Sequence, residues 1–151
     1  MQGFVNLKVR QNQHLQRKLT PDFVIDWLYK KVQKQINKVN EIGKNFNYFT
    51  PFESIFEKAE KAKQVISPGT QFGEGWLISG EILSFASQGV NHVISLQPFG
   101  CIANHIVEKG IEKRIKSLCP QMNILSLDFD SSVSDVNITN RLLLFIDNIN
   151  N

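Results

Sequence analysis

The pattern of hydrophobic and polar positions divides the chain into a helical half and a mixed half. In the helical half, apolar residues recur at helical spacing after Thr20-Pro21 and again after Thr50. Pro21 suits the first position of a helix, so the first pattern predicts a helix from there to about Val39. Thr50 and Glu53 match a capping box, which predicts a second helix that ends near residues 67–69.

The second half alternates helices with short β-branched runs. We expect a helix over 74–88, a strand over VNHVISLQ (90–97), an amphipathic helix over 101–118, a strand over NILSLDFD (123–130) and a last helix after Ser132. The helix over 101–118 should turn these side chains inward: Ile102, Ile106, Val107, Ile111, Ile115 and Leu118. A strand–helix–strand order of this length predicts two parallel strands joined by a crossover.

The predicted fold class is therefore α/β, with a helical N-terminal part and a small parallel βαβ unit of the Rossmann or flavodoxin type. Residues 1–70 should form the helical segment and 71–151 the βαβα part, and the two should make one compact domain. A parallel sheet with so few strands leaves one face and its edges to be covered. We therefore expect a homo-oligomer.

Charge is distributed unevenly. Residues 1–70 carry a net charge of +6, and residues 71–151 a net charge of −3. Lys30, Lys31, Lys34 and Lys38 share one predicted helix face, which is more commonly a solvated face than a binding site, and the small total charge argues against nucleic acid as a partner. No apolar run approaches the roughly 18 residues of a membrane span, and no signal peptide is evident, so we expect a cytoplasmic protein without membrane association.

The chemistry-bearing residues gather after the two predicted strands. The carboxyl ends of parallel strands meet at one edge, so Gln97 to Cys101 and Asp128 to Asp130 should be neighbours. Cys101 would stand near a helix N-terminus, which stabilises a thiolate as a nucleophile or metal ligand; a buried structural cysteine is an equally good reading. Cys119 lies at the far end of the predicted helix and cannot pair with Cys101.

Other catalytic signatures are weak or missing. His105, one turn after Cys101, would serve as a second ligand or an acid/base, although an exposed helix histidine is the commoner case. Asn104 occupies the position at which a CxxC pair would need cysteine. The sequence has neither of the two glycine-rich loops that bind nucleotide phosphates, G-x-x-x-x-G-K-[ST] and G-x-G-x-x-G, so it indicates no ATP or NAD site. The catalytic residues stay unassigned.

Three segments carry a resemblance to a known family. QFGEGWLISGEI, VNHVISLQPFGCIANHIVEKGI and NILSLDFDSSVSDVNITNR follow one another in order over roughly residues 65–145. They resemble the C-terminal region of the large bacterial proteins that fuse acyl-CoA dehydratase activase domains to a dehydratase-like part. This is the 2-hydroxyacyl-CoA dehydratase and CoA-enzyme activase family, found mainly in anaerobes.

The resemblance implies an iron–sulfur lyase system in which ATP drives an electron through a four-iron cluster into a radical dehydration of an acyl-CoA. It implies that Cys101 is a ligand of a 4Fe-4S cluster. The residues that match the surroundings of this cysteine or the second motif are Gln97, Pro98, Gly100, Asn104, His105, Asp128, Asp130, Asn137 and Arg141.

The leading hypothesis is a fragment or shortened member of that system, which contributes a cysteine-bearing α/β domain near a cluster or acyl-CoA site. A cubane cluster takes four thiolates and the chain has 2 cysteines, so other domains or subunits would supply the remaining ligands. We expect no activity from the chain alone. The alternative is a non-catalytic interaction or assembly module that keeps the fold. A stand-alone thiol enzyme ranks last, because no base or oxyanion partner is evident.

Overall fold

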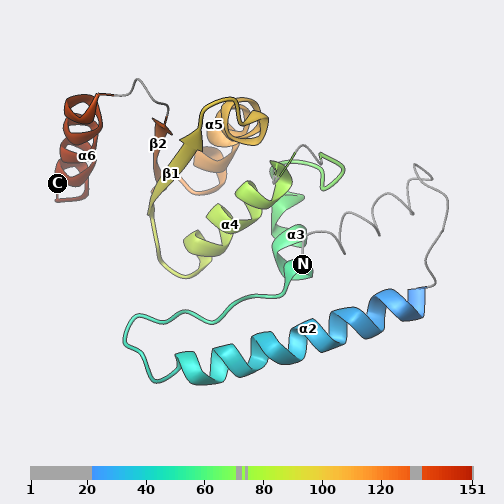
Figure 1. Cartoon of the computed structure of the whole chain (residues 1–151). Helices are drawn as coiled ribbons and strands as arrows, with labels where there is room; N and C mark the ends of the chain where they lie inside the picture. The colour runs from blue at the N-terminus through green and yellow to red at the C-terminus, as the bar shows by residue number, and fades with distance from the viewer. Residues whose placement is uncertain (1–21, 71–72, 74, 130–133, 151) are drawn as a thin grey trace.

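The computed structural model describes residues 22–70, 73, 75–129 and 134–150 (Figure 1). Its elements are, in chain order, α2 (Asp22–Gly43), α3 (Ile55–Ala62), α4 (Gly75–Ser87), β1 (His92–Pro98), the π-helix η1 (Ala103–Glu108), α5 (Lys109–Leu118), β2 (Asn123–Phe129) and α6 (Asp135–Asn150). The predicted fold class is confirmed: a helical N-terminal part precedes a small parallel sheet.

The sheet within the described residues consists of β1 and β2, which run parallel. Ser95 pairs with Ser126 and Gln97 with Asp128, so each pair lies on the same face of the sheet. On that face, η1 and α5 pack over the strands and join them. The core here consists of Ile82, Val107, Ile111, Ile115 and Met122, with Val93 and Ile124 packed against it.

The opposite face of the sheet is only partly covered. Figure 1 shows α6 on the side of the strands away from α5. The α6 residue Phe145 is buried and meets His92 of β1 edge-to-face, with ring centroids 6.1 Å apart. Nearby, Ile94 and Leu96 remain 43% and 59% exposed. The sheet therefore presents an apolar strip of β1 to solvent.

Helices α3 and α4 form a second, tightly packed core. Trp76 is fully buried and clusters with Ile55, Ala59 and Ala62. The close approach of the two helices depends on Gly80, because a Cβ atom there would lie 2.7 Å from the carbonyl oxygen of Lys58. This half of the molecule thus obtains its stability from dense apolar packing.

Helix α2 lies alongside this core and is the longest helix among the described residues (Figure 1). The Tyr29 hydroxyl is 2.9 Å from the Ser54 hydroxyl, and the Tyr29 ring meets Phe56 edge-to-face. Asn40 holds the backbone of Phe52 through both its amide oxygen and its amide nitrogen. Polar side chains therefore attach α2 at two points along its length.

The second helix starts later than predicted. Its capping box uses Ser54 and Glu57 rather than Thr50 and Glu53, and the helix begins at Ile55. The same Ser/Thr-x-x-Glu signature occurs four residues further on, and Asn40 binds the backbone of Phe52 in the preceding segment. The helix also ends at Ala62, five residues before the predicted end, and turns follow it.

The helix predicted over 101–118 is interrupted at its start. Its first part, η1, is a π-helix, whose wider turn changes the angular relation between the residues before it and those after it. Ala103 and Val107 face the core with Ile111 and Ile115, as their burial shows. Three residues that were expected to point inward are instead exposed: Ile102 by 53%, Ile106 by 66% and Leu118 by 36%.

Both cysteines are free thiols, as their separation in the sequence predicted. Cys101 precedes η1, and Cys119 caps the far end of α5. Over the residues that the structure describes, no helix combines the length and apolar character needed to cross a membrane.

Candidate functional site

The carboxyl edge of the sheet is shaped by a tight turn after β1. The backbone N–H of Phe99 donates to the carbonyl oxygen of Phe129 at 3.0 Å, so the strand pairing continues past β1. Gly100 has a φ of +75°, a conformation that side-chain-bearing residues rarely adopt, and the N–H of Cys101 closes the turn on the carbonyl of Pro98. Pro98 and Gly100 thus act through the backbone to place Cys101 at this edge.

Cys101 is half-buried, and its thiol has a defined partner. The Sγ atom donates to the amide oxygen of Asn104 at 2.9 Å. Through its amide nitrogen, Asn104 donates in turn to the carbonyl of Leu96 and to the carboxylate of Glu108, at 3.3 Å in both cases. Asn104 therefore connects the thiol to the first strand and to the buried side of η1.

Glu108 is the centre of this network, although it was not among the residues predicted from the sequence. Its side chain is 2% exposed and accepts hydrogen bonds from Ser95 on β1 at 2.5 Å and from Ser126 on β2 at 2.8 Å. The signal in the sequence was a carboxylate on a helix facing two serines at inward strand positions. Glu108 thus ties η1 to both strands below the edge.

His105 and Asp128 meet across the edge. The His105 Nδ1 atom lies 3.1 Å from the carbonyl oxygen of Cys101, and the Nε2 atom lies 3.6 Å from Oδ1 of Asp128. The ammonium group of Lys109 is 3.9 Å from the same oxygen. His105 is therefore neither a freely exposed helix residue nor a base directed at the Cys101 thiol.

Gln97 is fully buried, yet neither atom of its amide group has a hydrogen-bond partner among the residues that the structure describes. Its partner in the strand pairing is Asp128, whose Oδ1 atom is likewise buried without a hydrogen bond. Buried polar atoms are normally satisfied, so the Gln97 amide is an exception at this edge, whereas Oδ1 of Asp128 still has His105 and Lys109 as ion-pair neighbours.

The two outer edges of the sheet are each capped at one carbonyl. The odd-numbered residues of both strands direct their backbone N–H and C=O groups to the neighbouring strand, as the bond from Phe99 to Phe129 indicates. The backbone carbonyls of the even-numbered Leu96 and Ser126 therefore point away from the neighbouring strand. The amide nitrogen of Asn104 donates to the carbonyl of Leu96, and Arg141 of α6 donates to the carbonyl of Ser126. Such caps hinder further strand pairing.

The sequence-predicted residues Gln97, Pro98, Gly100, Cys101, Asn104, His105 and Asp128 are thus brought together at one edge. Asn137 is different: it is an exposed residue in the first turn of α6. Asp130 lies outside the described residues.

A complete iron–sulfur site does not fit this chain by itself. The sequence has 2 cysteines, and they lie at opposite ends of the η1–α5 segment. Within the described ranges, no three His, Cys, Asp or Glu side chains are grouped closely enough to hold a metal ion. Cys101 would supply one thiolate, and the others would have to come from other domains or chains.

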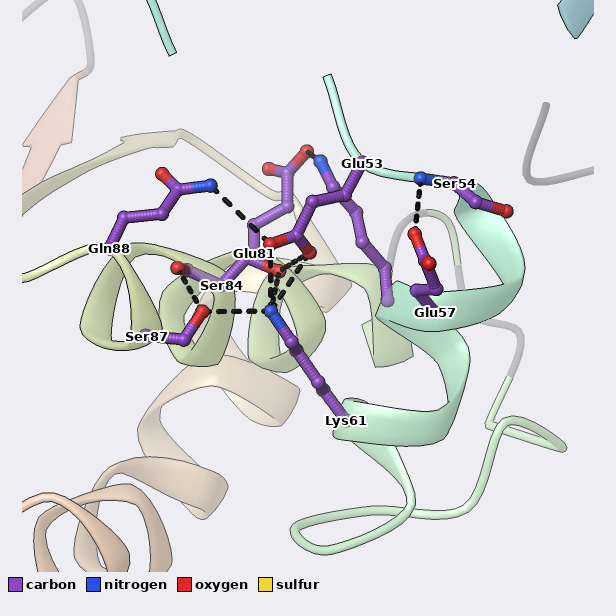
Figure 2. A network of polar contacts seen from close by, with 9 residues as sticks. Glu53, Ser54, Glu57, Lys61, Glu81, Ser84, Ser87 and Gln88 are labelled. Atoms are coloured by element: carbon purple, nitrogen blue, oxygen red, sulfur yellow. Dashed lines mark hydrogen bonds and ion pairs between the residues drawn. The ribbon is translucent and has the colours of Figure 1, made fainter. Parts of the chain in front are cut away.

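A second polar cluster joins α3 to α4 (Figure 2). Lys61 forms an ion pair with Glu53 at 2.8 Å and donates to Ser87, while Ser84 donates to Glu53 at 2.7 Å. Burial raises the pKa of the Glu53 carboxyl, but the hydrogen bonds and charge of Lys61, with Ser84 and Gln88, outweigh it, so the pKa lies below its ordinary value of 4.5.

We found no protein-family model, curated protein or solved structure that matches this chain.

Proposed function

We propose that this chain is an accessory α/β module of a 2-hydroxyacyl-CoA dehydratase/activase-type system, in which its cysteine-bearing edge completes a site shared between chains. The observation that carries the proposal is the incomplete polar edge. Cys101 is held at half exposure by Asn104, beside a fully buried Gln97 that has no partner among the described residues. Another molecule can reach the Cys101 thiol, which is partly exposed, whereas Gln97 is fully buried beneath it in the fold.

The arrangement favours binding over catalysis by the chain alone. A thiol nucleophile needs an adjacent base, but the Cys101 thiol faces an amide oxygen, and the ring nitrogens of His105 face a carbonyl and a carboxylate. The network through Glu108 instead fixes the position of the edge. We therefore assign Cys101 the role of one ligand among several, and the neighbouring loop the role of a contact for an acyl-CoA.

Anaerobic reconstitution with iron and sulfide tests this role when a dehydratase-type partner is present to supply the remaining thiolates. The proteins are wild type, Cys101→Ala and, as a matched control, Cys119→Ala, each checked for folding by circular dichroism. We expect wild type and Cys119→Ala to retain iron with thiolate-to-iron absorbance, and Cys101→Ala to lose both. Iron retained by none of the three, or lost equally in both variants, would contradict the proposal.

A second candidate function is a non-catalytic assembly module. The observation that favours it is the exposed apolar strip formed by Ile94 and Leu96 on the open face of the sheet. Complex formation with a dehydratase-type partner that persists in Cys101→Ala and is lost in Leu96→Glu would support this function over the first.

A further inference from the structure

Helix α2 presents a basic face to solvent. Its inner side is marked by Tyr29 and Asn40, which contact the segment that leads into α3. At about 3.6 residues per turn, the side turned away from that segment carries four exposed lysines and one exposed carboxylate: Lys30, Lys31, Lys34, Lys38 and Glu41. Figure 1 shows α2 at one margin of the described structure, so this basic face is open to a partner.

The charges on the basic face are not neutralised by the chain itself. Within the described residues, none of its four lysines has an ion-pair partner, whereas Lys58, Lys61 and Lys63, in and beside α3, each pair with a carboxylate. The ammonium group of Lys31 lies 4.0 Å from the centre of the Trp27 ring, and such a cation–π contact leaves its charge in place. The basic face therefore offers uncompensated positive charge to an anionic partner.

Aromatic side chains accompany these lysines. Phe23 and Trp27 lie on the same side of α2, towards its start, and are 73% and 54% exposed. Just past the end of the helix, Phe46 and Tyr48 are exposed as well, and Tyr48 has a φ of +69°, which a bulky residue rarely adopts. Tryptophan and tyrosine are the side chains that favour the boundary between lipid headgroups and acyl chains.

An apolar row borders the basic face, and it decides between two kinds of anionic partner. Its members are all exposed: Leu28, Val32, Val39 and Ile42. Nucleic acid would engage the lysines through its phosphates and leave this row in water. A bilayer surface accommodates both, because apolar side chains enter the acyl boundary while lysine stems extend along them to anionic headgroups. The 22 residues of α2 also match the length of interfacial helices, which is commonly about 20–30 residues.

We propose that α2 is an interfacial helix that docks this chain on an anionic lipid surface. The four lysines of the basic face lie against the headgroups, and Trp27 lies at the boundary with the acyl chains. A helix in the plane of the interface needs no membrane span, so the expectation of no membrane association, which followed from the lack of such a span, does not extend to α2. The proposal does not rest on Cys101 or on the proposed function.

Co-sedimentation with lipid vesicles tests the proposal. We expect the wild-type chain to bind mixed phosphatidylcholine–phosphatidylserine vesicles but not pure phosphatidylcholine vesicles, and salt to weaken the binding. The combined substitutions Lys30→Gln, Lys34→Gln and Lys38→Gln should weaken binding at least tenfold, since each lysine near an anionic surface contributes about fivefold. Circular dichroism checks that this variant remains folded.

A matched variant separates the basic face from total charge. The combined substitutions Lys63→Gln, Lys113→Gln and Lys116→Gln remove the same number of charges from exposed positions outside α2 and should leave binding nearly unchanged. An equal loss of binding in the two triple variants would overturn the proposal, as would a wild-type chain that does not bind the anionic vesicles.

Tryptophan fluorescence reports the contact itself. The sequence has 2 tryptophans, and Trp76 is fully buried, so a change in emission on adding vesicles arises from the exposed Trp27. We expect a blue shift in the wild-type chain and none in Trp27→Phe. Emission that vesicles leave unchanged, together with tighter binding to a single-stranded RNA oligonucleotide than to vesicles, would assign the lysines to nucleic acid and overturn the proposal.

Discussion

The α3–α4 unit and the sheet edge both combine buried polar groups with a helix, but they differ in how completely those groups are satisfied. In the α3–α4 cluster, the carboxylate of Glu53 is met by Lys61, Ser84 and Gln88, and the apolar core beneath it is dense. At the sheet edge, Gln97 and one oxygen of Asp128 lack hydrogen bonds within the described part of the chain. The polar groups of the first region are satisfied within the chain, whereas the described residues leave some of those in the second region without hydrogen bonds.

The largest expected effect is a loss of stability in the α3–α4 core. Trp76→Ala removes a fully buried side chain from the core between α3 and α4. We expect the free energy of unfolding to fall by about 3–5 kcal/mol, as for other buried aromatic residues. Urea denaturation followed by circular dichroism measures the loss. A loss below about 1 kcal/mol would mean that this core does not hold the fold.

A smaller loss should follow from overfilling the same region. Gly80→Ala places a Cβ atom 2.7 Å from the backbone carbonyl of Lys58, so the helices must separate. We expect a cost of about 1–3 kcal/mol in the same urea experiment. Gly110→Ala is the control, because a Cβ atom there meets no neighbour within 4 Å. Equal behaviour of the two variants would contradict the close helix contact.

The pH dependence of stability should report the paired state of Glu53. Its pKa is lowered in the folded protein, so its ion pair stabilises the fold above the unfolded-state pKa and ceases to do so as pH falls through the folded-state pKa. We therefore expect wild type to exceed Glu53→Gln in stability near neutral pH. The difference in urea midpoint between wild type and Glu53→Gln should become smaller below about pH 4.5. A difference that grows on acidification would contradict this pairing.

The smallest expected effect on stability lies at the open region. Cys101→Ser keeps a hydrogen-bond donor for Asn104 and should change the free energy of unfolding by less than about 1 kcal/mol. The same substitution should abolish iron retention in the complex reconstituted with a dehydratase-type partner. A change as large as that of Trp76→Ala would identify Cys101 as a structural residue and would remove the contrast between the two regions.

The sequence predicted much of this architecture because local signals agreed with the fold. Gly89, two residues after the end of α4, has a φ of +81°, as glycines that close helices commonly do, and the β-branched runs became β1 and β2. The edge residues followed from topology alone, since parallel strands end side by side.

What the sequence did not reveal depended on three-dimensional contacts. The π-helical turn of η1 changes which residues face the core, and no helical periodicity signals it. Glu108 was therefore not among the predicted site residues, although serines of both strands donate to its carboxylate. The later start of α3 accompanies a contact from another element, since Asn40 of α2 binds the backbone of Phe52 just before the helix.

A titration of the isotope-labelled chain with acetyl-CoA, followed by amide chemical shifts, tests most directly whether the sheet edge is the binding region. We predict saturable shifts at Gly100 to His105 and at Asp128, with Glu53 and Lys61 unaffected. Shifts confined to the lysines of α2, or no shifts at all, would contradict the assignment of the sheet edge as the functional site.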